Sequence, residues 1–448
     1  MAAYKQLNPD QLLDLLPDRA TVTRFVVAFS GGLDSSVLLL LMVQLRNAAP
    51  DFPPLSALHI HHGISANADQ WTTHCQQVCD RYDVPLDIQR VTADTRKASL
   101  ENNLREARYE SFTNTLQAGD VLLQAHHRDD QVETLLLRLF RGSGLRGSAG
   151  IPAQRALGAG QLCRPLLGYS RARLHDYAVA QQLDWVEDES NLDERFDRNY
   201  LRARLLPVIK QRWPGVEKTL PRFAAINDQS RQALAYLLEP LLAGMLDPDS
   251  GLRIKDLLAF PEPVQINLLR MWLERLRLAP PEYHQYHRVL AEVVAARPDA
   301  QPLLIAGDVE FRRHAGSLVA QRVLPRHDAG REWRWDPARS LELAGAGILS
   351  AVRVAHAGIA PVLQMPAPGR QFTVKFRSGG ERCRPVGRSG SHPLKKLLQE
   401  SAVPPWLRNR VPLVYLDDEL VAVADLWVCE GAIGAPGDGG LMLEWQRP

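Results

Sequence analysis

The chain has 448 residues, 45% of them hydrophobic and 23% charged, with a net charge of only +2. These values are typical of a globular protein, and the length predicts two or three domains that each bury a core. Five scattered cysteines exclude a disulfide framework and favour a cytoplasmic location, while no secretory leader and no membrane-spanning run is expected.

Short apolar runs alternate with longer helical patterns through the first third of the chain. Strands are predicted at 24–28, 55–60, 86–91 and 120–124. Helices are predicted at 8–16, 37–43, 66–82, 100–116 and 129–140. This alternation predicts an α/β fold with a doubly wound parallel sheet, in which ligands bind at the carboxyl ends of the strands.

A serine- and glycine-rich loop joins the first predicted strand to the following helix. Its amides and hydroxyls would cradle phosphate at a helix N-terminus. Asp34 would repel a phosphate unless Mg²⁺ lay between them, so the loop predicts a metal–nucleotide site. The alternative is a turn in which Asp34 and Ser35 only cap the helix. The candidate residues are Ser30, Gly31, Gly32, Leu33, Asp34, Ser35 and Ser36.

Two further polar clusters follow predicted strands. His59 and His61 close the second strand, and Asp130 and Glu133 begin the helix after the fourth. The two acids are three residues apart and share a helix face, where they can hold an ammonium group. Simple helix capping, or metal ligation together with the neighbouring histidines, stays open. Three polar clusters at one sheet edge predict an active site there.

Arginines accompany this edge. Arg105 and Arg108 share a helix face and either neutralise the charge of departing pyrophosphate or pair with acids at a solvated surface. Arg141 and Arg146 flank a glycine-rich stretch that is either a lid that contacts backbone phosphate or an ordinary surface turn. Arg198 begins a basic stripe that includes Arg202.

After the first domain the sequence pattern no longer alternates between strands and helices. Residues 216–296 are mostly helical, 300–322 predict a hairpin, and 323–368 predict poorly determined strands and a linker. A last small unit follows. We therefore expect a first domain at 1–217, a mostly helical middle domain at 218–350 and a small α+β domain at 369–448.

The last unit carries a strong basic bias. Between Arg370 and Arg410 there are ten lysines or arginines, two acids and the aromatic Trp406. Because the net charge of the chain is low, this local patch is the expected nucleic-acid-binding surface. A solvated basic face is the alternative. The candidate residues are Arg382, Arg384, Arg388, Lys395, Lys396 and Arg408.

Several motifs along the chain resemble those of known protein families. The segment SGGLDSS resembles the PP-loop of the ATP pyrophosphatase superfamily, whose members adenylate a substrate and release pyrophosphate. In order along the chain, HIHHG, AHHRDDQVET, RGSGLRG, DRNYLR and HPLKKLLQE extend the resemblance to the tRNA(Ile)-lysidine synthase family. This resemblance covers the whole chain and implies an adenine nucleotide alpha hydrolase-like, Rossmann-like catalytic domain.

The resemblance also implies a reaction. ATP adenylates the wobble cytidine of isoleucine tRNA with a CAU anticodon, and free L-lysine displaces AMP at C2, which changes codon specificity from AUG to AUA. It implies that ATP binds residues 30–36, His59 and His61, and that Asp34 holds Mg²⁺. Asp34, Arg105, Arg108 and Arg198 would be catalytic.

The other implied roles concern lysine and tRNA. Asp130 and Glu133 would bind lysine, while Arg141, Arg146, the middle domain and the basic tail would bind tRNA. Leu104 departs from the family pattern, where alanine is expected. The sequence leaves the oligomeric state open, a homodimer included.

Three other functions are alternatives to the one that the resemblance implies. A PP-loop thiolase of the 2-thiocytidine type needs paired cysteines, whereas Cys75 and Cys79 are spaced C-x-x-x-C on an early helix, which disfavours sulfur transfer. An amidating PP-loop enzyme would not need a basic tail. A non-enzymatic nucleotide sensor with an RNA-binding tail would not need Asp130 and Glu133 beside the loop.

Overall fold

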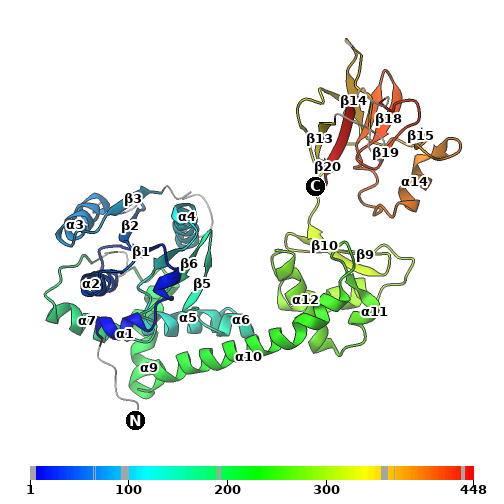
Figure 1. Cartoon of the computed structure of the whole chain (residues 1–448). Coiled ribbons are helices and arrows are strands. Elements are labelled where there is room, and N and C mark those ends of the chain that lie inside the picture. Colours follow the sequence, from blue (N-terminus) through cyan, green and yellow to red (C-terminus); the bar gives the residue numbers. More distant parts are fainter. Residues whose placement is uncertain are drawn as a thin grey trace. The chain divides into compact units, whose positions relative to one another are not determined.

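The computed structural model describes residues 7–63, 65, 67–91, 100–187, 189, 193–354, 362–367, 369–434 and 439–448. The chain divides into two compact units, Met1–Tyr236 and Leu237–Pro448 (Figure 1). The division falls inside the long helix α10 (Val216–Met245), and the domain boundary expected from the sequence, at residue 217, lies at the start of this helix. None of the described helices has the length and hydropathy needed to cross a membrane.

The first unit is built on a six-stranded sheet with the strand order β3-β2-β1-β4-β6-β5. All neighbours pair in parallel except β5, which runs antiparallel to β6 at the edge. The predicted parallel sheet is therefore confirmed. The strands are β1 (Arg24–Ala28), β2 (Leu55–His61), β3 (Leu86–Arg90), β4 (Asp120–Leu123), β5 (Gln154–Leu157) and β6 (Gly160–Cys163).

Helices cover both faces of this sheet. In β1, Phe25 and Val27 pack into a core with α2, α3 and α7, whereas Val26 packs on the opposite face with Phe112 of α4 and Leu116, which follows α4. This alternation confirms the doubly wound arrangement, because successive strand side chains point to opposite faces. The helices are α1 (Pro9–Leu13), α2 (Leu33–Ala48), α3 (Ala68–Arg81), α4 (Leu100–Thr115), α5 (Arg128–Phe140), α6 (Leu145–Ser148) and α7 (Arg171–Ala180).

A run of short helical segments leads from the sheet to α10. A π-helical turn, η3, interrupts the run and carries Arg202, one turn after Arg198. π-Helical turns are rare and often mark functional positions. The segments are α8 (Asp197–Tyr200), η3 (Leu201–Leu205) and α9 (Leu206–Arg212).

The second unit begins with helices around a small antiparallel sheet of order β7-β10-β9-β8. The predicted hairpin is confirmed: β9 pairs with β10, and Ala315 and Gly316 have positive φ at the turn. The helical segments are α11 (Ile254–Leu257), α12 (Glu262–Arg275), α13 (Tyr283–Arg288) and the π-helical η4 (Val289–Val294). The strands are β7 (Leu252–Arg253), β8 (Leu303–Ala306), β9 (Val309–His314) and β10 (Ser317–Arg322).

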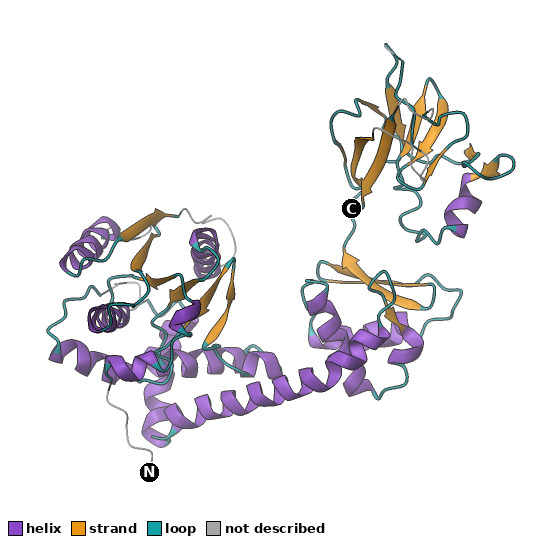
Figure 2. Ribbon diagram, viewed as in Figure 1, coloured by secondary structure: helices purple, strands orange, loops and turns teal. Residues whose placement is uncertain are grey.

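The C-terminal part of this unit is mostly strands (Figure 2). Trp335, Leu343 and Leu349 share one core with Phe372 and Leu413. Part of the segment expected to be a linker thus packs with the last unit. The strands are β11 (Trp333–Trp335), β12 (Leu341–Leu343), β13 (Gly347–Val354), β14 (Phe372–Lys375), β15 (Arg382–Cys383), β16 (His392–Pro393), β17 (Leu413–Leu416), β18 (Glu419–Val423), β19 (Trp427–Val428) and β20 (Gly440–Gln446), with one helix, α14 (Leu394–Glu400).

Candidate active site

The loop after β1 forms a compact cradle at the N-terminus of α2. Ser35 Oγ donates to Gly32 O at 3.0 Å and lies 3.1 Å from Ser30 Oγ, so the loop is closed by its own hydroxyls. Gly31 has a φ of +78°, and a Cβ there would meet Cys75 Sγ at 2.9 Å. Gly32 is the N-cap and has no side chain that could bond the first helical amides. These amides therefore face the cradle, where an anion would accept from them.

Asp34 lies in the first turn of α2 with one unbonded oxygen. Its Oδ1 is buried and has no hydrogen-bond partner among the described residues. Within the described part of the chain no group of three or more acids, histidines and cysteines could hold a metal ion. A single carboxylate fits Mg²⁺, which is usually bound by one or two carboxylates together with substrate phosphates and water.

The two histidines of β2 are engaged with the protein. His59 is buried, and its Nδ1 lies 2.9 Å from Phe29 O while its Nε2 lies 3.3 Å from Thr72 Oγ1. Burial lowers the pKa of His59. His61 Nε2 lies 3.2 Å from Asp69 Oδ1. His59 therefore supports the residue before the cradle, and its predicted contact with ATP stays a prediction, as does that of His61.

The acids of α5 form a network with two arginines. Glu133 is fully buried; its Oε2 accepts from Arg198 Nε at 2.7 Å, and its Oε1 accepts from Arg202 Nε at 2.7 Å. Asp130 Oδ1 accepts from Arg198 Nη2 at 2.6 Å, and its Oδ2 accepts from the backbone N–H of His127 at 2.8 Å. The predicted ammonium site is thus occupied by guanidinium groups in this structure.

His127 connects this network to the cradle. Its Nε2 lies 3.5 Å from Asp34 Oδ2 and 3.5 Å from Asp130 Oδ2. Burial opposes the charged imidazolium, but the surrounding carboxylates outweigh burial and raise the pKa of His127. Burial likewise opposes the Asp130 carboxylate, and His127 and Arg198 outweigh it, so the pKa of Asp130 is lowered. The positive charge of His127 and the negative charge of Asp130 therefore stabilise each other.

The other predicted arginines of the first unit lie outside the acid–arginine network. Arg105 and Arg108 are exposed on α4, and Arg108 Nη2 lies 3.2 Å from His62 Nε2. Arg141 pairs with Asp197 at 2.9 Å. The backbone of Arg146 is in α6, and its side chain lies outside the described residues.

The predicted tRNA-binding residues of the C-terminal part are mostly exposed but engaged. Arg384 pairs with Glu430, and Arg388 Nη1 lies 2.5 Å from Glu400 Oε2. The others have weaker or different contacts: Arg382 donates to Ser391, Lys396 lies 3.9 Å from Glu400, Arg408 donates to Val403 O, and Lys395 is exposed with no ion pair to a described residue.

Two residues were missed as site components. Arg202 was expected only in a basic stripe, yet it makes two hydrogen bonds to Glu133. Its spacing of four from Arg198 puts both arginines on one helical face, and this was the available signal. Arg164 is buried after β6 and bonds Tyr109 and His126. The sequence marks it only within the motif Arg164-Pro165-Leu166, which is part of the family resemblance and assigns it no role.

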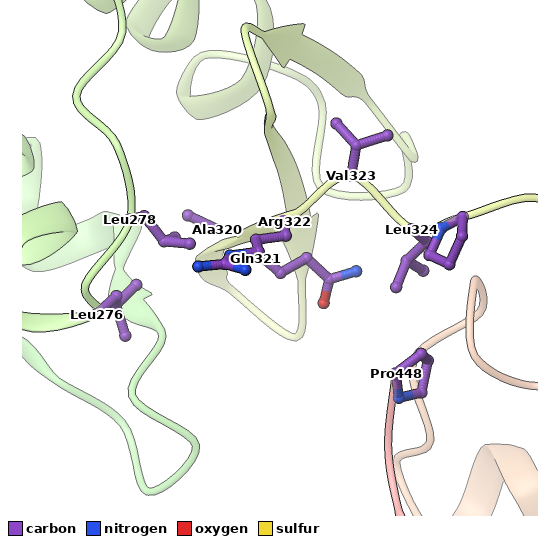
Figure 3. A pocket seen from close by; sticks show the side chains of 9 residues that line it. Leu276, Leu278, Ala320, Gln321, Arg322, Val323, Leu324 and Pro448 are labelled. Atoms are coloured by element: carbon purple, nitrogen blue, oxygen red, sulfur yellow. The ribbon is translucent and has the colours of Figure 1, made fainter. Parts of the chain in front are cut away.

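A separate hollow of about 470 Å³ lies in the second unit (Figure 3). Leu276, Leu278, Val323 and Leu324 contribute to its mostly apolar wall. It contains none of the residues predicted for the active site.

Three family models match separate parts of the chain. The PP-loop domain matches residues 5–209, the TilS substrate binding domain matches residues 252–319, and the TilS substrate C-terminal domain matches residues 372–445. The first match contains the cradle and the acid–arginine network. It indicates that this part of the chain uses ATP.

Similar proteins are found over nearly the full length. The tRNA(Ile)-lysidine synthase of Serratia proteamaculans is 41% identical over 98% of this chain and 100% of its own. That of Pseudomonas aeruginosa is 42% identical over 98% and 97%. Among solved structures, the U34-tRNA thiolase NcsA from Methanococcus maripaludis, with its [4Fe-4S] cluster, matches 49% of this chain and 77% of its own at 13% identity and a TM-score of 0.41. The identity and coverage of the two synthases show that this chain belongs to the tRNA(Ile)-lysidine synthase family.

Proposed function

We propose that this chain ligates L-lysine to C2 of the wobble cytidine in the CAU-anticodon isoleucine tRNA. ATP is consumed to adenylate the tRNA, and AMP and pyrophosphate are released. The observation that carries this proposal is the acid–arginine network beside the PP-loop, because an acidic pocket next to an adenylating site suits an amine as second substrate. A pure nucleotide sensor would have no need for it.

The cradle residues act first. The free amides at the start of α2 and the loop hydroxyls would bind the triphosphate. Asp34 would hold Mg²⁺, which when bound neutralises phosphate charge and polarises the reacting phosphorus. Arg105 and Arg108 would stabilise the charge of departing pyrophosphate.

The acid–arginine network acts second. A lysine ammonium that binds Asp130 and Glu133 would compete with Arg198 and Arg202, because both arginines already donate to these carboxylates. We assign Arg198 a second task in this exchange: the guanidinium released from the acids becomes available to the adenylated tRNA. The two arginines thus keep the acidic pocket compact before lysine arrives.

The proposal is tested with the full-length protein, Mg²⁺, ATP, labelled lysine and isoleucine tRNA that bears a CAU anticodon. Labelled lysine is expected in the tRNA together with an equal amount of AMP. A tRNA whose wobble cytidine is replaced by uridine serves as the control and should remain unlabelled. AMP formation without lysine incorporation, or incorporation of sulfur from a donor, would overturn the proposal.

The C-terminal patch gives a separate prediction. Lys395→Ala is expected to weaken tRNA binding severalfold and to reduce the slope of log affinity against log salt by about 1, because one phosphate contact is lost. Lys395 is suited to this test because its ammonium is exposed and has no ion pair to a described residue. Salt-dependent binding measurements on both proteins provide the check.

Arg353→Ala is the matched control for that variant. Arg353 is also exposed, but it lies on β13, away from α14 in the C-terminal part (Figure 1). An equal loss of salt dependence in both variants would mean that α14 has no special part in tRNA binding.

A further inference from the structure

A second arginine cluster lies on the α4 side of the sheet, around the ring of Tyr109. The Cζ of Arg105 is 5.7 Å from the ring centroid and the Cζ of Arg155 is 5.1 Å from it. Arg164 Nη2 donates to Tyr109 Oη at 3.0 Å, and this hydroxyl lies 3.3 Å from Gln124 Oε1. Three positive side chains from α4, β5 and the end of β6 therefore meet at one tyrosine.

The buried member of this cluster is held entirely by neutral groups. Arg164 donates to Gln124, to His126, to Pro152 O and to Tyr109. Within the described part of the chain, no carboxylate lies within ion-pairing distance of Arg105, Arg155 or Arg164. Buried charges in proteins are normally paired, so a buried arginine without a counter-ion beside two exposed arginines favours an anion that arrives from outside.

The pKa shifts of Tyr109 and Arg164 also indicate a concentration of positive charge at this position. Burial opposes ionisation of Tyr109, but Arg164, Arg105 and Arg155 outweigh burial and lower the pKa of its hydroxyl. Burial and the neighbouring arginines also lower the pKa of Arg164, although Tyr109 opposes them. The positive charge is therefore concentrated at this position and is not cancelled locally.

We propose that Arg155 and Tyr109 form a binding site for a backbone phosphate of the RNA substrate, with Arg164 as the fixed cation beneath it. This inference deepens the proposed function and rests on it for the identity of the RNA. Arginine suits the task, since its planar guanidinium can bind phosphate through two parallel hydrogen bonds. The phosphate contact would fix the position of the RNA and carry no sequence information.

The alternative anion is the pyrophosphate released from ATP. The sheet order places β5 three strands away from β1, which leads into the PP-loop cradle. Three strand spacings amount to about 14 Å, which is too far for a phosphate that still lies in the cradle to reach Arg155. Arg155 is also exposed on the edge strand, where an extended polymer can pass. Both features favour an RNA phosphate.

The test uses the full-length protein and the variant Arg155→Ala. The affinity for isoleucine tRNA, measured directly without lysine, is expected to fall about tenfold, with a salt slope reduced by about 1. The KM for ATP and inhibition by pyrophosphate are expected to stay unchanged. Arg155→Lys, which keeps the charge, is expected to retain the salt slope and recover part of the affinity.

Arg171→Ala is the matched control, because Arg171 is also exposed but lies on α7, which packs on α2 at the opposite face of the sheet. Unchanged tRNA affinity and salt slope in Arg155→Ala would overturn the inference. Weaker pyrophosphate inhibition with normal tRNA binding would overturn it in favour of a pyrophosphate site. A protein that binds tRNA through Arg155 but incorporates no lysine would refute the proposed function alone.

Discussion

Replacing Asp34 with alanine is expected to reduce AMP formation by about 100-fold or more, because a carboxylate that holds Mg²⁺ accounts for several kcal/mol of transition-state stabilisation. The buried Oδ1 of Asp34 has no hydrogen-bond partner among the described residues, whereas its Oδ2 lies 3.5 Å from His127 Nε2, so the variant also removes one carboxylate from this buried imidazole. The free energy of unfolding should fall by about 1–2 kcal/mol, through the lost charge at the helix N-terminus and the lost ion pair with His127, which keeps Asp130 as a partner. AMP release and denaturant unfolding provide the two measurements.

Two further variants separate the metal role from the capping role. Asp34→Asn keeps the shape of the side chain and should remain inactive, with ATP binding that no longer depends on Mg²⁺. Asp10→Ala removes an exposed acid from the first turn of another helix, α1, and should retain full activity. Normal AMP formation by Asp34→Asn would show that the carboxylate only caps the helix.

The parallel sheet could be predicted because its strands are short buried runs. All four residues of β4 are buried, and apolar side chains alternate between two cores in β1. The hairpin β5–β6 escaped prediction since the first three residues of β5 are exposed and give no apolar pattern. The strands β11 to β13 were expected only as poorly determined strands within 323–368, because β11 pairs with β14 and β13 pairs with β20, both farther along the chain.

The site was predictable only in part. The residues of the cradle are consecutive, so their motif reveals them directly. The partners of Glu133 could not be read in the same way, because Arg198 and Arg202 are 65 and 69 residues away and meet it only in the fold. Arg164 and Tyr109 are likewise 55 residues apart. Sequence patterns record periodicity within an element, whereas these contacts depend on how the elements pack.

Replacing Glu133 with alanine is expected to have two effects. The free energy of unfolding should fall by about 3 kcal/mol, because removal of one partner from a buried ion pair leaves uncompensated charge. Arg198 and Arg202 stay partly exposed, which places the loss at the lower end of the usual range. The KM for lysine should also rise about tenfold or more, since a hydrogen bond to a charged group contributes about 1.5–3 kcal/mol. Denaturant unfolding and lysine-dependent AMP release measure these effects separately.

Arg202→Ala is the variant that separates the two roles, because it removes the opposite charge from the same pair. It should also lower the stability, since Glu133 loses two of its three hydrogen bonds. Its effect on lysine should have the opposite sign: with one competing guanidinium gone, the lysine KM should stay equal or fall. If both variants lose stability and neither changes the KM for lysine, Glu133 only supports the fold and the ammonium binds elsewhere. Opposite shifts in KM would instead show that the two arginines occupy the amine site until lysine arrives.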